Sequence, residues 1–450
     1  MRAALARSLF RLMRSDWMEE LHRLENAQWR PADELADGSH EKLAGMLRFA
    51  CAHVPFYRDF SAQAGLDPDR VGPPDLGVFP LMTKKDLMDR QERFLAEGRN
   101  PEDRVTNATG GSSGVWFRFY VDRSALSLRV ANAYRGAAWT GWRVGEKQAV
   151  LWGHPRDNQA IKGLRGRVMA NLAHRSLNLN AYDMDEAKLA EFSRALRSWR
   201  PVMIRGYASA LAFLADYMQE HGLPLDSPAG IISSAETLTD AYRSSIEGHF
   251  RCKLLNRYGS REFADIAQQC EQVDGFHVFN DRVHVEVLRP DGTPCDPGEQ
   301  GEIVITDLEN RVMPFIRYRT GDLARPRAGL CACGRGFPLL ASVEGRTSEL
   351  IVGKNGKYYS CQSPRLFGAD IPGIGQMQLI QETIEAIEIR IVPDAAWTPE
   401  SRTALEKRML GLLGDIHLKV SLVEAIPPAP SGKYPFTISK VSPFHSREQP

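Results

Sequence analysis

The sequence of 450 residues has almost no net charge, because 57 lysines and arginines stand against 56 aspartates and glutamates. Without an overall positive field it is not typical of a nucleic-acid-binding protein, and we expect no nucleic-acid partner. It also has no run of about 18 uncharged apolar residues, so no transmembrane segment is predicted. With 43% hydrophobic and 25% charged residues, the composition is that of a soluble chain with a sizeable core. The length favours a large domain with a smaller one appended.

Cysteine is scarce, and the number of cysteines is odd. The seven are Cys51, Cys252, Cys270, Cys295, Cys331, Cys333 and Cys361. In a chain of this length they do not form a disulfide framework, which favours a reducing compartment, the cytoplasm. Cys331 and Cys333, separated by one residue, suggest metal binding instead.

The first 15 residues are basic and amphipathic, with four arginines and no acidic residue. They lack the apolar core and the cleavage site of a secretory signal. A helix packed on the body of the protein is the expectation, and a transit peptide or an interfacial helix are the alternatives.

Hydrophobic periodicity predicts a mixed α/β fold. Helices are expected at 15–29, 40–52, 84–92 and 122–142, before an alternation of strand 147–153, helix 184–199, strand 202–205 and helix 209–221. That alternation indicates parallel strands with crossover helices. Short strands with turn signals between 276 and 323 indicate a β-rich subdomain.

The last hundred residues have the make-up of a small α+β domain. A hairpin is expected at 350–359, followed by strand 382–392, helix 399–414 and strand 417–424. We therefore predict two domains, residues 1–344 and residues 345–450.

A loop rich in glycine and hydroxyl side chains is the strongest local signal for chemistry. It contains Thr109, Gly110, Gly111, Ser112, Ser113 and Gly114. Its amides and hydroxyls could wrap phosphate oxygens. It matches neither the Walker loop nor the dinucleotide fingerprint, and by itself a solvent-exposed linker is as good an interpretation.

Five later segments give this loop a context. They are Ser233-Ser234-Ala235-Glu236, Tyr258-Gly259-Ser260-Arg261-Glu262, Tyr318-Arg319-Thr320-Gly321-Asp322, Gly345-Arg346 and Ser431-Gly432-Lys433. Each is weak alone. In this order, the set resembles the adenylate-forming (AMP-binding) superfamily, and within it the phenylacetate–coenzyme A ligases and their capsule-biosynthesis relatives. The resemblance extends from residue 53 to residue 433, and it implies a large N-terminal α/β domain with a β-rich subdomain and a small mobile C-terminal domain.

The resemblance also implies roles for individual residues. The loop from Thr109 to Gly114 would hold the ATP phosphates, Glu262 would ligate Mg²⁺, and Asp322 would accept hydrogen bonds from the ribose. Further nucleotide contacts are implied for Ser234, Ala235, Glu236, Tyr258, Gly259 and Ser260. Arg346 matches the arginine at the hinge. Lys433 matches the lysine that bridges the substrate carboxylate and the α-phosphate, with Lys440 as a weaker rival.

The sequence departs from the family pattern at the hinge. Ser348 stands two residues after Arg346, where relatives usually have Asp or Lys. This leaves the hinge and the second half-reaction less well defined. For the acyl substrate, Tyr207, Ala208 and His154 are the candidates, although an aromatic residue beside a small one at a strand end is more often packing.

Cys331 and Cys333, with Cys270 and His277, could form a closed Cys₃His zinc site. The Cys-x-Cys-Gly-Arg segment resembles a feature of the same ligase branch. Four protein ligands would leave no position for water, so the metal would be structural. His284 is the alternative to His277, and Cys252 and Cys295 are expected to be ordinary packing or surface residues.

The resulting hypothesis is an ATP-dependent, AMP-forming ligase that activates a carboxylic acid and transfers the acyl group. The acceptor is left open between coenzyme A, an amine and a carrier-protein thiol, and a homodimer is compatible with the sequence. The alternative is a catalytically silent protein of the same fold that serves a polysaccharide or secondary-metabolite pathway. Glu262, Asp322 and Lys433 argue against that alternative, because a silent relative has no need for these charges.

Overall fold

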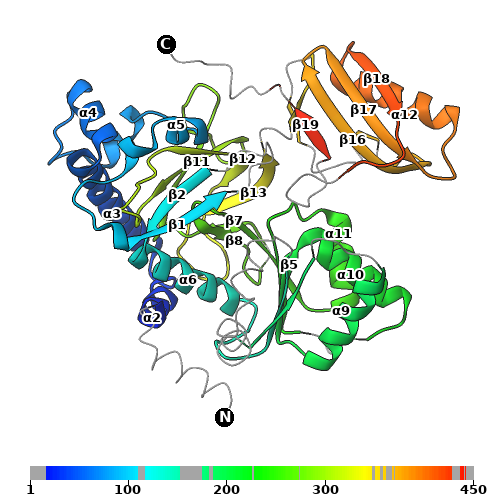
Figure 1. The fold of residues 1–450 in the computed structure, drawn as a ribbon, viewed down its shortest axis with the longest axis horizontal. Helices are drawn as coiled ribbons and strands as arrows, with labels where there is room; N and C mark the ends of the chain where they lie inside the picture. The colour runs from blue at the N-terminus through cyan, green and yellow to red at the C-terminus, as the bar shows by residue number, and fades with distance from the viewer. Residues whose placement is uncertain are drawn as a thin grey trace.

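The structure is a computed structural model (Figure 1). It describes residues 17–109, 117–152, 175–181, 186–224, 228–272, 274–346, 350–354, 358–360, 367–368, 370–427, 436–439 and 441. The basic segment 1–15 lies outside the described residues. No helix in the described part of the chain has the length and apolarity that crossing a bilayer requires.

Helices dominate the first hundred residues, as predicted. They are α2 (Trp17–Ala27), α3 (Ala32–His53), α4 (Pro55–Gln63), α5 (Lys84–Asp89) and the 3₁₀ turns η1 (Pro73–Val78) and η2 (Gln91–Phe94). A further 3₁₀ turn, η3 (Pro101–Asp103), follows directly after them. The predicted helix 84–92 is divided between α5 and η2, because Arg90 leaves the helical conformation at φ −133° and ψ 33°. The Asp86 side chain closes a capping box with Thr83 at the start of α5.

Most strands belong to one sheet with eleven strands. The order across this sheet is β10-β11-β12-β13-β9-β8-β7-β6-β5-β3-β4. Its parallel half consists of β3 (Gln148–Leu151), β4 (Ser176–Leu179), β5 (Met203–Tyr207), β6 (Gly230–Ser234) and β7 (Lys253–Ser260). The predicted alternation of strands and crossover helices is confirmed there.

Both faces of the parallel half are covered. Helices α9 (Glu186–Trp199), α10 (Ala208–Glu220) and α11 (Asp240–Phe250) lie on one face, drawn in green in Figure 1, over a core that includes Ile204 and Ile231. On the other face, Met203 and Ile232 pack with Ala137 of α6 (Arg123–Ala138). Helix α6 begins where the Asp122 carboxylate accepts the amide of Ala125 at 2.8 Å.

The antiparallel half forms the predicted β-rich region. It consists of β8 (Ala264–Gln268), β9 (Phe276–Val278), β10 (Val283–Leu288), β11 (Gly301–Asp307), β12 (Tyr318–Arg327) and β13 (Leu339–Arg346). A separate hairpin, β1 (Arg104–Thr109) with β2 (Phe117–Asp122), adds Phe117 and Phe119 to the core shared with the N-terminal helices.

The C-terminal residues form a smaller sheet with its own core. Its order is β18-β17-β16-β19, from β16 (Ile374–Thr383), β17 (Ala386–Pro393), β18 (His417–Leu422) and β19 (Thr437–Ser439). Helix α12 (Pro399–Leu413) packs Leu405 and Met409 against Leu379 and Ile389. The predicted hairpin is present as β14 (Leu350–Val352) and β15 (Tyr358–Ser360).

The mixed α/β class predicted from the sequence is confirmed. Two boundaries were wrong. The helix predicted at 40–52 already begins at Ala32, and the predicted strand 382–392 runs across the turn between β16 and β17, so that β17 begins at Ala386. The predicted domain division at residues 344 and 345 falls within β13, and it stays a prediction.

Candidate active site

The candidate nucleotide residues lie where parallel strands of the large sheet end. One row across β5, β6 and β7 consists of Tyr207, Ser234 and Arg257, which are paired in register. Tyr258 is the next residue along β7. In open α/β sheets, ligands bind at the carboxyl ends of the strands. The geometry therefore places several predicted residues at the edge where chemistry is expected.

Directly after β6 the backbone turns sharply. Ala235 has φ +65°, in the left-handed region that residues with a side chain rarely occupy. The Glu236 carboxylate then accepts the amide of Ser209 at 2.9 Å and its hydroxyl at 2.7 Å. Glu236 thus ties this turn to the first turn of α10, beside Tyr207 and the buried Ala208.

Tyr258 and Asp322 come together from distant parts of the sheet. The Tyr258 hydroxyl donates to Asp322 Oδ2 at 2.8 Å, and the Asp322 amide donates to Thr320 Oγ1 at 3.1 Å. Asp322 is paired in register with Arg346 across β12 and β13. The backbone therefore brings the predicted hinge arginine beside the predicted ribose carboxylate.

Glu262 sits in the turn after β7, near the end of β1. Its Oε1 accepts the Tyr318 hydroxyl at 3.2 Å. The Asn107 side chain of β1 reaches the carbonyl of Arg261 at 3.5 Å, and β1 ends at Thr109. A half-buried carboxylate oriented by one phenol suits a hard cation such as Mg²⁺.

Gly259 permits the tight turn that carries Ser260 and Glu262. The β7–β8 register shifts between Tyr258 and Gly259, and a Cβ on Gly259 would lie 2.5 Å from the carbonyl oxygen of Ala264. Only hydrogen fits there. The Ser260 hydroxyl accepts the amide of Phe263 at 3.2 Å and closes the turn.

Several predicted site residues lie outside the described residues: Gly110, Gly111, Ser112, Ser113, Gly114, His154 and Lys433. For Thr109 and Arg346 only the backbone is described. Among the acyl-pocket candidates, the Tyr207 ring lies 4.4 Å from the ring of Trp152, centroid to centroid.

Two arginines beside these residues were missed in the sequence analysis. Arg257 donates from Nε to Ser234 Oγ at 3.2 Å and from Nη1 to Asp265 Oδ2 at 3.2 Å. Arg205 lies on β5, two residues before Tyr207. Burial and then the charge of Arg257 lower the pKa of Arg205 to about 10, which leaves it charged at neutral pH. The available signal was an arginine inside an otherwise apolar strand.

The predicted metal ligands are brought together by the antiparallel half of the sheet. The ligand atoms of Cys270, His277, Cys331 and Cys333 all lie within 4.8 Å of one another. The Cys270 and Cys331 sulfurs are 3.6 Å apart, and Cys333 Sγ is 3.5 Å from His277 Nε2. His284 lies elsewhere, on β10 opposite Thr306.

The surroundings act differently on the two kinds of ligand and on the individual thiols. Burial raises the pKa of Cys270 to about 12, whereas at Cys333 burial is outweighed by the amide and the charge of Arg335, which lower the pKa. The amide of Gln272 points at Cys270 Sγ at 3.4 Å, and that of Arg335 at Cys333 Sγ at 3.5 Å. Burial first, and then Arg335, lowers the pKa of His277 to about 4, so its ring is neutral and able to ligate. The donor set and its spacing fit a tetrahedral Zn²⁺.

Arg335 also holds the cluster against the N-terminal helices. Its Nη1 lies 3.0 Å from the Glu271 carboxylate, and its guanidinium stacks between Trp29 and Trp139 at 4.6 and 4.4 Å from the ring centroids. These contacts connect the Cys331–Cys333 turn to the residues that follow α2 and α6.

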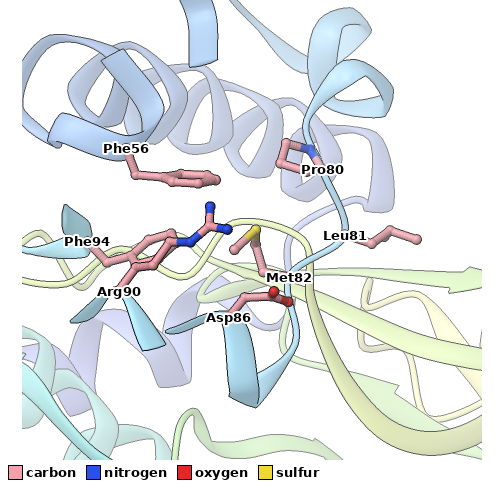
Figure 2. Close-up of a pocket in the computed structure, with 7 residues that line it drawn as sticks. All are labelled: Phe56, Pro80, Leu81, Met82, Asp86, Arg90 and Phe94. Atoms are coloured by element: carbon pink, nitrogen blue, oxygen red, sulfur yellow. The ribbon is translucent and has the colours of Figure 1, made fainter. Parts of the chain in front are cut away.

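A small cavity of about 150 Å³ lies away from the predicted site residues, between α4 and α5 (Figure 2). It is lined by Phe56, Pro80, Leu81, Met82, Asp86, Arg90 and Phe94. The Phe56 and Phe94 rings are 4.4 Å apart, and Asp86 is engaged as a helix cap. None of the predicted site residues lines this cavity.

Comparison with known proteins agrees with the resemblance seen in the sequence. Residues 364–440 match the family model of the CapK C-terminal domain. A phenylacetate–coenzyme A ligase of Thermus thermophilus is 25% identical over 371 residues, which cover 80% of this chain and 82% of that protein.

Solved structures agree on the fold. A 2-hydroxyisobutyryl-CoA ligase in complex with 2-HIB-AMP superposes with a TM-score of 0.71 at 21% identity, covering 91% of this chain and 90% of that one. The amide bond synthetase McbA of Marinactinospora thermotolerans gives a TM-score of 0.52 at 16% identity, covering 76% of this chain and 70% of that one. The predicted adenylate-forming fold, with a large N-terminal and a small C-terminal unit, is confirmed.

Proposed function

We propose that this AMP-forming ligase, a relative of the phenylacetate–coenzyme A ligases and of CapK, activates a carboxylic acid as an acyl-adenylate and transfers the acyl group to a thiol or an amine. The observation that carries the proposal is the meeting of Tyr258 with Asp322, and of Glu262 with Tyr318, at the end of the parallel strands. These contacts supply a nucleoside-binding carboxylate and a cation ligand at one edge of the sheet.

Each described residue has a task in nucleotide binding. Asp322 accepts the Tyr258 hydroxyl on one oxygen and would accept ribose hydroxyls when nucleotide binds. Glu262 would hold Mg²⁺, which supplies charge neutralisation for the triphosphate when bound. The loop from Thr109 would surround the β- and γ-phosphates with amides and hydroxyls.

The reaction then proceeds by two displacements. An oxygen of the acid attacks the α-phosphorus, the bond to the bridging oxygen breaks, and pyrophosphate leaves. The acceptor next attacks the acyl carbonyl carbon, loses its proton, and AMP leaves with the bonding electron pair. Lys433 would stabilise the negative charge that develops in the first displacement.

Coenzyme A is the acceptor that we favour. The T. thermophilus relative carries this activity in its name, and the 2-hydroxyisobutyryl-CoA ligase shares the fold. An amine is the second candidate, because an amide bond synthetase has the same fold. A carrier-protein thiol is the third.

The Cys₃His cluster belongs to the proposal as a structural zinc site. Zinc would hold β8, β9 and the Cys331–Cys333 turn together, and with four protein ligands it leaves no position for reacting water. Free thiols of this kind persist in the cytoplasm, which we propose as the compartment.

The test is a pyrophosphate-release screen with ATP, Mg²⁺ and a panel of aryl, fatty and amino acids. Mass spectrometry after addition of coenzyme A or amines identifies the product. We expect release that depends on the acid, and a thioester in the presence of coenzyme A. An amide in the presence of amines, with no thioester, would replace the favoured acceptor. No release with any acid would refute the ligase and favour a silent binding protein.

A further inference from the structure

Two arginine side chains share one face of the parallel sheet near the candidate acyl residues. Side chains along a strand alternate between faces. Met203 packs on the α6 face, so Arg205 and Tyr207 point to that face as well. Ile232 packs there too, which places Ser234 on the same face, and Arg257 contacts Ser234 directly.

The positive charge on this face exceeds the negative charge. Arg257 forms an ion pair with Asp265 at 2.9 Å. Arg205 is half-buried, and within the described part of the chain it forms no ion pair or hydrogen bond. Tyr134 also faces Arg205, but burial raises the pKa of its phenol to about 12, so it carries no charge at neutral pH. Two guanidinium groups thus share one carboxylate.

An uncompensated guanidinium in this position has a cost. Removing a charged group from water disfavours the folded state unless a counter-charge or hydrogen bonds replace the lost hydration. Among the described residues, the carboxylate that acts on Arg205 is that of Asp265, which is already paired with Arg257. An anionic ligand would supply the missing partner.

The position of Arg205 relative to the nucleotide residues indicates which part of a ligand it meets. Tyr258, which contacts Asp322, lies one residue past the row formed by Tyr207, Ser234 and Arg257. Arg205 pairs with Ile232, two residues before that row. At about 3.3 Å per residue, this is roughly 7 Å deeper along the strand. An acid whose carboxylate reaches the nucleotide would direct its far end toward Arg205.

We propose that the acid activated by this ligase carries a second anionic group, a carboxylate, which Arg205 binds with Arg257 beside it. The inference rests on the proposed function and specifies its substrate class. Arg205 is then the residue that determines specificity, because a planar guanidinium pairs with a carboxylate through two parallel hydrogen bonds.

The experiment compares matched acids in the pyrophosphate-release assay. The pairs are glutarate with valerate, adipate with hexanoate, and 4-carboxyphenylacetate with phenylacetate. We expect the dicarboxylic member of at least one pair to have the higher kcat/KM. In Arg205→Met, which keeps the length but removes the charge, kcat/KM for that acid should fall about 10- to 100-fold, the value of a charge-assisted hydrogen bond.

Two controls separate specificity from stability. Arg194→Met changes an exposed arginine on α9 and should leave all rates unchanged. In Arg205→Met, the KM for ATP and the rate with the monocarboxylic partner should stay within about twofold of the wild type, because neither involves the second carboxylate.

Each outcome is decisive. Release with monocarboxylic acids only, or equal losses for both members of a pair in Arg205→Met, would overturn the inference and leave the ligase intact. Release with no acid of either kind would refute the proposed function itself, and with it the inference.

Discussion

The hydroxyl of Tyr258 is a single atom whose removal tests the nucleotide site. In Tyr258→Phe the ring remains, but Asp322 loses the hydrogen bond of 2.8 Å that orients its carboxylate. A hydrogen bond of this kind contributes about 1 kcal/mol, so we expect the KM for ATP to rise about fivefold with little change in kcat. Steady-state kinetics with varied ATP measures this. Tyr242→Phe, half-buried on α11, is the control, and an unchanged KM in Tyr258→Phe would contradict the assignment.

The cysteine cluster allows a test that does not depend on activity. Elemental analysis of protein produced with sufficient metal should find about one zinc per chain. In Cys333→Ser the site loses a ligand, and we expect zinc affinity to fall by more than the roughly 10- to 100-fold that loss of an outer hydrogen-bond partner costs. The unfolding temperature should fall by several degrees, because metal binding stabilises the folded state.

Cys252→Ser is the matched control, since Cys252 packs on the face of the sheet that α9, α10 and α11 cover and lies outside the cluster. It should keep full zinc content. Wild-type protein without zinc, or equal zinc content in Cys333→Ser, would show that the four side chains do not form a metal site.

Residue types and their spacing predicted the cysteine–histidine cluster but not the two arginines. Cys331-x-Cys333 and His277 stand out in a sequence because thiols and imidazoles are rare and chemically specific. Arg205 and Arg257 are common residues, and nothing in their local spacing relates them. They become neighbours only through the register of β5, β6 and β7, which is a property of the folded sheet.

At the scale of elements, an ion pair fastens α6 to the turn before β10. Arg135 Nη1 lies 2.6 Å from Asp281 Oδ2, and both side chains are buried. Burial alone would raise the pKa of Asp281, but the charges of Arg135 and Lys42 outweigh it, so the pKa is lowered. In the unfolded chain, the pKa of an aspartate is about 3.9. Because the pKa of Asp281 is lower than this in the folded state, its ionised carboxylate stabilises the fold above about pH 3.9, and the stabilisation is lost as the pH falls below that value.

We therefore expect Asp281→Asn to lower the free energy of unfolding by about 3–5 kcal/mol at pH 7, because Arg135 is left buried and unpaired. The wild type should lose stability below about pH 4, whereas the variant should lack this part of the acid transition. Thermal unfolding between pH 3 and 7 measures both effects. Asp274→Asn, at an exposed pair with Arg327, should change the unfolding temperature little, and an equal effect there would refute the argument.

Elements with strong local patterns were predicted well, and elements defined by distant partners were not. The periodic helices α6, α9, α10 and α12 appeared close to their expected positions. Strand β19, only three residues long, was missed because it forms by pairing with β16, far away in sequence. Hairpin β1–β2 was missed for a related reason: the Gly/Ser segment indicated a loop for phosphate, and its local pattern did not predict the two strands that pair on either side of it.

At the scale of the whole molecule, the small C-terminal unit carries Lys433, whose loss should affect the two half-reactions differently. Lys433 lies within the segment that matches the CapK C-terminal domain. The proposed mechanism uses its charge only while pyrophosphate leaves, and a C-terminal unit that rotates at the hinge would take Lys433 away for acyl transfer. Loss of this lysine should therefore affect the first displacement far more than the second.

In Lys433→Ala we expect the rate of adenylation, measured as pyrophosphate release, to fall at least about 100-fold, as for removal of one group that stabilises developing charge. Acyl transfer from chemically prepared acyl-adenylate to coenzyme A, followed by mass spectrometry, should stay within severalfold of the wild type. Lys407→Ala, an exposed lysine on α12, controls for a general effect on the small unit. Equal losses in both half-reactions would mean that Lys433 acts throughout the cycle, and the proposal of a rotating C-terminal unit would then lose its support.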